Sequence, residues 1–279
     1  MDVATAYARC LSDARSHYEN FPVASVLIPK PMRPHVAALY AFARAADDFA
    51  DEGDRSPEER LRLLERWQAR LVQAATETGL GDAPGPGEPP HAQAIFVAVG
   101  ESIRTLGLPL ALFEDLLSAF AQDVRVVRYD TWASLLDYCR RSANPVGRLV
   151  LRIGGYADPR LDRLSDDICT ALQLTNFWQD LKLDLARGRL YLPREVLVAS
   201  GADQGDLARG LTDAWRRAIA DVVARTRQLF EAGRPLCDAL SGRLKYEVRA
   251  TWLGGTRVLD LIEQRRFDVM AHRPVLGAA

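Results

Sequence analysis

The sequence predicts an all-α protein. Apolar residues recur every three to four positions in almost every long segment, which is the spacing of an amphipathic helix rather than of a strand. Short breaks rich in glycine, proline or aspartate separate these segments. With 279 residues the chain is long enough to bury a large core. We therefore expect one domain over residues 1–279, with roughly eight or more helices around a central cavity.

The helices are expected in the following order along the chain. The first runs from Tyr7 to His17, and a proline-rich stretch then leads into a helix that ends near residue 51. Ser56 and Pro57 mark the start of the next helix, because serine caps a helix N-terminus and proline favours its first turn. That helix is expected to end near residue 78. Further helices are expected at residues 91–105, 110–124, 132–153, 164–185, 205–233 and 236–263, with loops at 79–90 and 189–193.

Composition and charge narrow the class of protein. Apolar residues at 48%, charged residues at 26% and a formal charge of −1 are typical of a globular protein and do not favour nucleic-acid binding. The four cysteines are scattered without a CxxC pattern, which favours a reducing compartment. The first residues lack the basic and long apolar regions of a signal peptide, and no run of 18 apolar residues occurs, so we expect neither a signal peptide nor a membrane span. We expect a cytoplasmic protein without an obligate protein partner.

The end of the chain is the one segment that suggests contact with a membrane. It combines basic and apolar residues, and it either associates peripherally with a membrane surface or forms a plain tail. The residues concerned are Arg265, Arg266, Phe267, Met270 and Arg273.

Two acidic clusters are the most specific feature of the chain: DDFAD at residues 47–51 and DLKLD at residues 180–184. At 3.6 residues per turn, carboxylates at these spacings project from one side of a helix. Carboxylates on a core-facing side repel each other and lose hydration, so we expect a cation to neutralise them. Oxygen ligands without His or Cys suit Mg²⁺, which usually binds one or two carboxylates together with substrate phosphates.

A single acidic pair of this kind more often marks a solvated helix face, but the neighbouring residues favour a site. Residues 36–43 are apolar nearly all round, as in a buried helix. A narrow polar stripe of Gln173, Asn176, Gln179 and Asp180 runs along an otherwise apolar segment. Polar groups in such a place need partners, and a ligand-filled cavity supplies them. The two clusters are therefore expected to face one cavity that binds Mg²⁺ and a diphosphate.

The motifs resemble those of the squalene and phytoene synthases. Residues 173–184 and 189–193 are similar to the family's QxxN-x-x-[RQ]-D-x-x-x-D and R-x-[YF]-x-P, and residues 40–51 to its Y-x-x-x-R-x-x-D-D-x-x-D. His17 and Phe21 match an H-x-x-x-F pattern near the N-terminus. The order and separation of the three elements agree over nearly the whole chain.

The resemblance implies an isoprenoid synthase fold and Mg²⁺-dependent ionisation of a prenyl diphosphate. It implies that the catalytic carboxylates are also the metal ligands, with one amide beside them. The metal set is Asp47, Asp48, Asp51, Asn176, Asp180 and Asp184. The expected substrate-binding set is His17, Phe21, Tyr40, Arg44, Arg141, Gln173, Asn176, Gln179, Arg189 and Tyr191. Of these, Arg44, His17 and Arg189 either bind the diphosphate or pair with a motif carboxylate.

Departures from the family pattern indicate one branch. Members that join two prenyl diphosphates usually carry Arg where this chain has neutral Gln179, and a family tyrosine is replaced by Arg141. These changes, with Asn144, resemble the bacterial hydroxysqualene synthase branch, which rearranges presqualene diphosphate and captures the cation with water. A polar site that admits water fits that reaction, although these residues also suit a structural network. The alternatives are head-to-head joining of two prenyl diphosphates and a non-catalytic scaffold.

Overall fold

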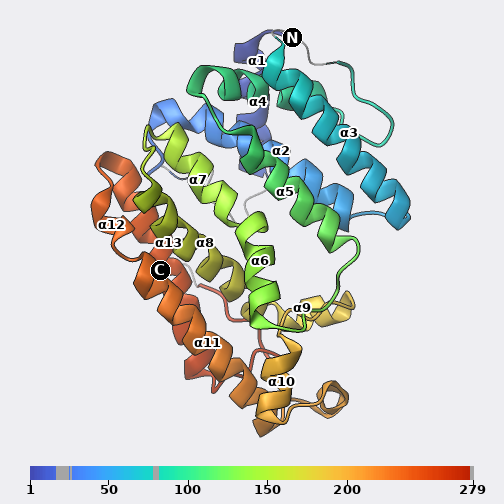
Figure 1. Ribbon diagram of the computed structural model, residues 1–279, viewed down its shortest axis with the longest axis vertical. Coiled ribbons are helices and arrows are strands. Elements are labelled where there is room, and N and C mark those ends of the chain that lie inside the picture. Colours follow the sequence, from blue (N-terminus) through green and yellow to red (C-terminus); the bar gives the residue numbers. More distant parts are fainter. Residues whose placement is uncertain (17–24, 26, 78–81, 277–279) are drawn as a thin grey trace. The chain divides into compact units, whose positions relative to one another are not determined.

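The computed structural model describes residues 1–16, 25, 27–77 and 82–276, and their regular structure is helical (Figure 1). No β-strand occurs among these residues; Arg128 and Leu190 form an isolated parallel bridge. The helices are α1 (Val3–Ser16), η1 (Lys30–Met32), α2 (Arg33–Asp51), α3 (Pro57–Thr76), α4 (Ala92–Leu106), α5 (Leu110–Asp123), α6 (Trp132–Ser142), α7 (Asn144–Ile153), α8 (Pro159–Gln179), α9 (Leu181–Ala186), α10 (Arg194–Ser200), η2 (Gln204–Arg209), α11 (Asp213–Gly233), α12 (Leu236–Ala239) and α13 (Gly242–Gln264).

The chain divides into two compact units. The first comprises residues 1–125, 145–158 and 242–247, and the second comprises residues 126–144, 159–241 and 248–279. The all-α class is confirmed. The single domain around a central cavity stays a prediction.

In the first unit, α2 lies among α1, α3, α4 and α5 (Figure 1). Its buried side meets a cluster of aromatic rings around Trp67, which is fully buried. The Trp67 ring centroid lies 5.9 Å from that of Phe42, 5.1 Å from Phe49 and 4.4 Å from Phe96. The indole nitrogen donates to the Phe42 carbonyl at 3.3 Å, so the ring also fixes the position of α2 along its axis.

The start of α3 follows the prediction. The Ser56 hydroxyl accepts from the Glu59 amide at 3.2 Å, and the Glu59 carboxylate accepts from the Ser56 amide at 2.8 Å. This reciprocal capping box satisfies two amide donors that have no partner inside the helix. Ser56 and Pro57 therefore fix the residue at which α3 begins after the turn that follows α2.

Four of the long helices predicted from periodicity are interrupted in the structure. The segment 132–153 breaks at Ala143, because Pro145 has no amide hydrogen to donate into a continuing helix and its ring clashes with the preceding turn. The segment 164–185 breaks at Asp180, and the segment 205–233 breaks near Gly210, whose φ is 102°. The segment 236–263 breaks before Gly242, which has a positive φ of 60°. Periodicity continued across these breaks, so it did not reveal them.

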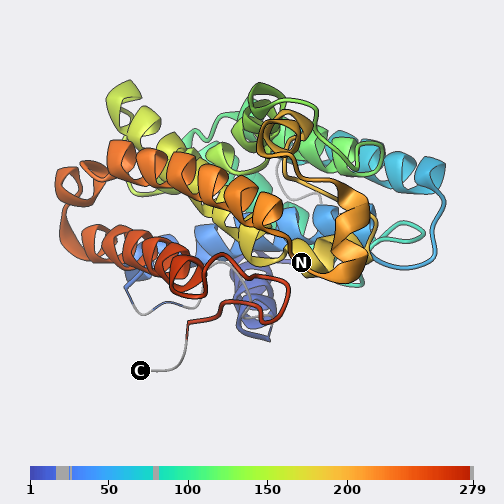
Figure 2. The same ribbon diagram turned by 90° about the horizontal axis from the view of Figure 1, so that it is seen from below.

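In the second unit, α8 and α11 pack along one another, and α6, α10 and α12 pack against this pair. Arg227 links α11 to α13: it donates to Asp260 at 2.7 Å and to Glu263 at 2.8 and 2.9 Å. Figure 2 shows α11 in orange and α13 in red running side by side, joined at one end through α12. The residues after α13 then turn back along the chain (Figure 2).

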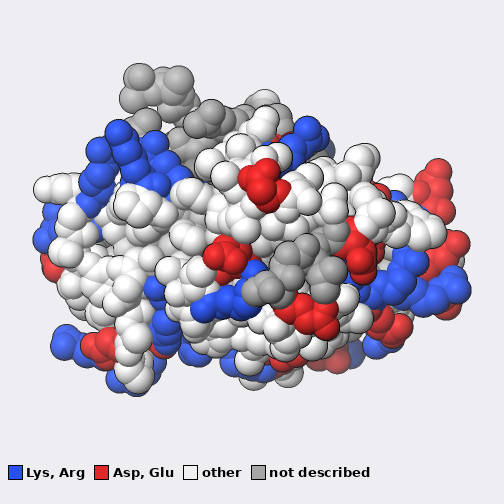
Figure 3. Space-filling model, turned by 90° about the horizontal axis from the view of Figure 1, so that it is seen from above, with Lys and Arg blue, Asp and Glu red and all other residues white. Residues whose placement is uncertain are grey.

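The surface carries both charge signs. On the face seen in Figure 3, basic and acidic side chains lie among uncharged ones, in keeping with the formal charge of −1. None of the described helices is long and apolar enough to cross a membrane.

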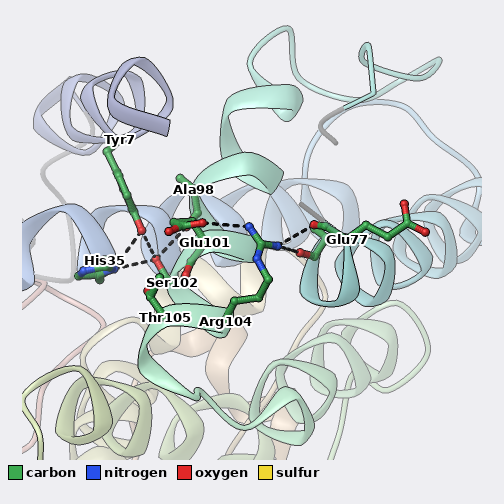
Figure 4. Close-up of polar contacts among 9 residues, drawn as sticks. Tyr7, His35, Glu77, Ala98, Glu101, Ser102, Arg104 and Thr105 are labelled. Carbon is green, nitrogen blue, oxygen red and sulfur yellow. Dashed lines mark hydrogen bonds and ion pairs between the residues drawn. The ribbon is translucent and has the colours of Figure 1, made fainter. Parts of the chain in front are cut away.

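A polar cluster joins α1, α2 and α4 inside the first unit (Figure 4). The Ser102 hydroxyl donates to the Ala98 carbonyl at 2.8 Å. The Tyr7 hydroxyl and His35 Nδ1 each lie 2.9 Å from Ser102 Oγ. The Tyr7 hydroxyl also lies 3.1 Å from His35 Nδ1, so the three side chains form one closed set of polar contacts.

We predict that His35 makes the protein less stable at acidic pH. Burial lowers the pKa of His35 below its usual value, and Glu101 only partly opposes this effect. The unfolded state therefore binds the proton more tightly, and stability present above pH about 6.5 is lost as the pH falls towards the folded pKa. Chemical denaturation between pH 7.5 and 5 should show a shallower decline for His35→Gln than for the unchanged protein. Equal slopes would contradict the prediction.

Two adjacent glycines of α13 provide a matched test of helix packing. A Cβ on Gly255 would lie 2.5 Å from the buried Phe230 ring and 2.8 Å from Leu172, whereas one on Gly254 would meet Leu276 at an ordinary 3.6 Å. Gly255→Ala should destabilise the protein by about 1–3 kcal/mol through overpacking. Gly254→Ala should stabilise it by up to about 1 kcal/mol, because alanine favours a helix. Urea unfolding of both variants measures the difference, and equal effects would refute the close packing.

Candidate functional site

The first acidic cluster lies at the C-terminal end of α2. Phe49 and its neighbours on the buried side hold this end of the helix against α3 and α4. The cluster itself is half-buried rather than enclosed: the side chains of Asp47 and Asp48 are 42% and 41% exposed. Upstream of the cluster, residues 36–43 agree with the expected buried helix, since all of them except Tyr40 and Ala43 are buried. The polar strip there comprises Tyr40, Arg44, Asp47, Asp48 and Asp51.

Arg44 is the cation beside this cluster. Its Nε lies 2.9 Å from Asp48 Oδ1 and its Nη1 lies 3.8 Å from Asp47 Oδ2. Burial would lower the pKa of Arg44, but the carboxylates of Asp48 and Asp47 outweigh it and raise the pKa. Arg44 thus remains charged. Of its two expected roles, pairing with motif carboxylates is present in this structure.

Arg60 of α3 fixes the backbone at the end of the acidic helix. Its guanidinium donates to the carbonyls of Phe49 at 3.0 Å, Glu52 at 3.1 Å and Gly53 at 2.7 Å. These carbonyls belong to the last turn of α2 and the turn after it, where helical partners are absent. Sequence reasoning missed Arg60, since no motif marks a side chain that caps the preceding helix.

A pocket of about 820 Å³ opens beside the first cluster within the first unit. α2 contributes Tyr40, Arg44 and Asp48 to its wall. α1 contributes Arg9 and Asp13, which form an ion pair at 3.2 Å. The pocket thus presents positive and negative side chains together, with Asp48 as the carboxylate of the first cluster in its lining. Its other lining residues are Ala41, Ala45, Phe49, Glu52, Gly53, Arg55, Gly87, Glu88, Pro89 and His91.

The second acidic cluster lies where α8 ends and α9 begins. Asp180 leaves helical geometry, with φ −102° and ψ 12°, and becomes the residue before α9. Its amide still donates to the Asn176 carbonyl at 2.8 Å, and its carbonyl accepts from the Asp184 amide at 2.9 Å. The Arg189 amide then donates to the Asp184 carbonyl at 2.8 Å. The chain therefore bends at Asp180 while its amide and its carbonyl both keep helix-like hydrogen bonds to residues four positions away.

Two residues near the end of the chain contact this cluster. Arg273 Nη2 donates to Asp180 Oδ2 at 3.1 Å, and its Nε donates to Oδ1. The side-chain amide of Gln179 donates to the Pro274 carbonyl. Gln179 is buried and its amide is engaged by the chain itself. A contact between residues 93 positions apart in sequence is not visible in the motif.

Tyr191 belongs to a cluster of aromatic rings. It stacks on Phe177 with centroids 3.7 Å apart and an interplanar angle of 5°. Tyr129 and Tyr138 approach it with centroids 5.9 and 6.2 Å away. Tyr191 and Phe177 are buried. The rings form an apolar wall just after the second motif.

The remaining expected residues are placed as follows. Arg141 lies in the last turn of α6 and pairs with Asp137 at 3.2 Å, which Arg140 contacts as well. The helix expected over residues 132–153 therefore ends just after these two arginines. Asn144 is buried and its Oδ1 accepts from Thr170 at 2.8 Å. Gln173 lies half-buried on α8. His17 and Phe21 lie outside the described residues.

The side chains present suit Mg²⁺. Each cluster offers carboxylate oxygens without sulfur or imidazole, which is the donor set for a hard cation. At Asp48 and Asp180 a guanidinium already provides positive charge, which agrees with the expectation that these carboxylates need a cation. The first cluster belongs to the first unit and the second to the second unit. That both face one cavity stays a prediction.

Comparison with known proteins identifies the family. A family model described as squalene/phytoene synthase matches residues 14–278. The hydroxysqualene synthase of Zymomonas mobilis is 39% identical over 80% of this chain and 72% of its own length. That of Sinorhizobium fredii is 34% identical over 91% and 82%. A phytoene synthase of Synechococcus elongatus is 27% identical over 97% and 88%.

Solved structures agree with this assignment. The crystal structure of the squalene synthase HpnC from Alicyclobacillus acidocaldarius superposes with a TM-score of 0.84 at 39% identity, covering 95% of this chain and 96% of that one. A dehydrosqualene synthase superposes with a TM-score of 0.79 at 19% identity over 96% and 89%, which supports the fold alone. The chain has the isoprenoid synthase fold and is an enzyme that belongs to the squalene/phytoene synthase family.

Proposed function

We propose that this enzyme is a hydroxysqualene synthase. It ionises presqualene diphosphate with the aid of Mg²⁺ and captures the rearranged cation with water, releasing hydroxysqualene and diphosphate. The observation that carries this choice within the family is the identity of 34–39% to proteins named hydroxysqualene synthase, against 27% to the phytoene synthase. The acidic motifs support the diphosphate chemistry common to both.

The carboxylates are proposed to hold the metal and through it the diphosphate. Asp47, Asp48 and Asp51 would contribute from α2, and Asp180 and Asp184 from the second motif, with the Asn176 amide one turn earlier. When bound, Mg²⁺ supplies positive charge that stabilises the diphosphate as the C–O bond breaks. Arg44, held in its charged form by the adjacent carboxylates, adds donors beside the same anion. Arg60 keeps the end of α2 in place and so orients these ligands.

The aromatic wall is proposed to keep bulk water from the carbocation. The stacked rings of Phe177 and Tyr191 are 6% and 9% exposed, so they present little surface to bulk water. Aromatic faces also stabilise nearby positive charge. The polarity attributed to Gln179 and Asn144 gives less support, since both side chains make contacts inside the protein.

Product analysis tests the proposed reaction. The purified enzyme with Mg²⁺ is incubated separately with presqualene diphosphate and with farnesyl diphosphate, without NADPH. We expect hydroxysqualene from presqualene diphosphate and no consumption of farnesyl diphosphate. Oxygen from H₂¹⁸O should appear in the alcohol. Conversion of farnesyl diphosphate would instead establish the head-to-head synthase.

Replacing one motif carboxylate should separate catalysis from stability. Asp51→Asn is expected to lower product formation roughly 100-fold, because the motif loses a charged metal ligand. Its free energy of unfolding should change by less than about 0.5 kcal/mol, since the side chain is not in the core. Asp54→Asn is the matched control: Asp54 is exposed and lies just past the motif, and activity should be retained. Full activity of Asp51→Asn would remove Asp51 from the metal site.

A further inference from the structure

The C-terminal segment, residues 265–276, lies on the second acidic motif. We refer to it as the strap. Its base is held by Arg216 of α11, which donates to the Arg266 carbonyl at 2.6 Å and to Asp268 at 3.1 Å. Asp268 in turn accepts from the Ala271 amide at 3.0 Å. The strap is therefore a folded part of the second unit with a defined path.

The far end of the strap is held by the motif itself. Pro274 is buried and its carbonyl accepts from the Gln179 amide. The next contact is the two-pronged pairing of Arg273 with Asp180, in which Nε and Nη2 each meet one carboxylate oxygen. Neighbouring residues of the strap thus bind neighbouring residues of the motif. This register places one guanidinium on one proposed metal ligand.

That contact has a chemical consequence at Asp180. The guanidinium contacts both carboxylate oxygens and supplies positive charge and hydrogen bonds to them. Asp180 must give up these contacts before it can bind a metal cation. The Asp180 side chain is 23% exposed and that of Arg273 is 43% exposed. The pair is therefore only partly desolvated, so exchanging one cation for another at Asp180 costs less than it would in the core.

We propose that Arg273 is a built-in counter-ion that competes with the divalent cation for Asp180, and that binding of the cation releases the end of the strap. The inference rests on the proposed function, in that Asp180 is taken as a metal ligand. In the absence of metal, the strap neutralises the carboxylate and covers Gln179. When metal is bound, the Arg273 guanidinium leaves Asp180 and becomes available to an anionic ligand.

Cation binding in the absence of substrate tests the competition. Mn²⁺ is titrated by electron paramagnetic resonance into the full-length protein, Arg273→Met and Arg266→Met. Arg273→Met should bind Mn²⁺ about three- to ten-fold more tightly, because the carboxylate no longer has an internal partner. Arg266→Met removes the same charge from an exposed site of the strap and should bind as the unchanged protein does. The Mn²⁺ affinity of Arg273→Lys should lie between that of Arg273→Met and that of the unchanged protein.

The outcomes separate this inference from the proposed function. If Arg273→Met no longer tightens Mn²⁺ binding when Asp180→Asn is already present, the competition is located at Asp180. Equal or weaker Mn²⁺ binding by Arg273→Met than by the unchanged protein would overturn the inference and leave the metal site standing. Absence of Mn²⁺ binding in every protein would overturn the metal site and the inference together.

Hydrogen exchange gives a second readout that does not depend on activity. Saturating Mg²⁺ should increase amide exchange in residues 271–276 of the unchanged protein, because the end of the strap is released. In Arg273→Met these amides should exchange rapidly with and without Mg²⁺. Protection of the strap that is the same with and without Mg²⁺ in the unchanged protein would contradict the release.

Discussion

Charge compensation of half-buried carboxylates is the constraint on which the site depends. A carboxylate that has lost part of its hydration needs a positive partner or hydrogen-bond donors. In this structure the partner is a guanidinium at each motif: Arg44 beside Asp48 on the same helix, and Arg273 beside Asp180 from the end of the chain. The two solutions differ in reach. The first is local and follows from helical spacing, whereas the second requires the fold to return the chain to the motif.

The surrounding structure positions the charged residues by holding the backbone that carries them, rather than by holding their side chains. Around α2, the rings packed on Trp67 set the depth of the helix, and Arg60 holds its final carbonyls. Around Asp180, the chain bends between α8 and α9 but retains the hydrogen bond from Asp184 to the Asp180 carbonyl. A bent motif turns its carboxylates differently from a straight helix. The proposed metal ligands are thereby presented on a backbone that is itself well supported.

The motif residues divide into two groups by their environment. The carboxylates and Arg44 are half-buried and near polar partners, as a binding role requires. Gln179, Asn144 and Tyr191 are buried and make contacts within the protein. Departures from a family pattern can therefore reflect local packing as well as altered chemistry. Branch membership is better argued here from overall similarity than from Gln179.

The sequence alone determined the helical class, the capped start of α3 and the two acidic motifs, because helical periodicity, capping and motif spacing are local properties of the chain. It also linked the motifs to a family. The breaks at Ala143 and Asp180 were not predicted, since apolar periodicity continues through them. The contacts of Arg60 and Arg273 were decided by the tertiary structure alone. Arg60 reaches back across the turn between α2 and α3 to carbonyls 7 to 11 residues away, and Arg273 reaches a carboxylate 93 residues away. Only the folded chain sets which carbonyl or carboxylate a long cationic side chain reaches.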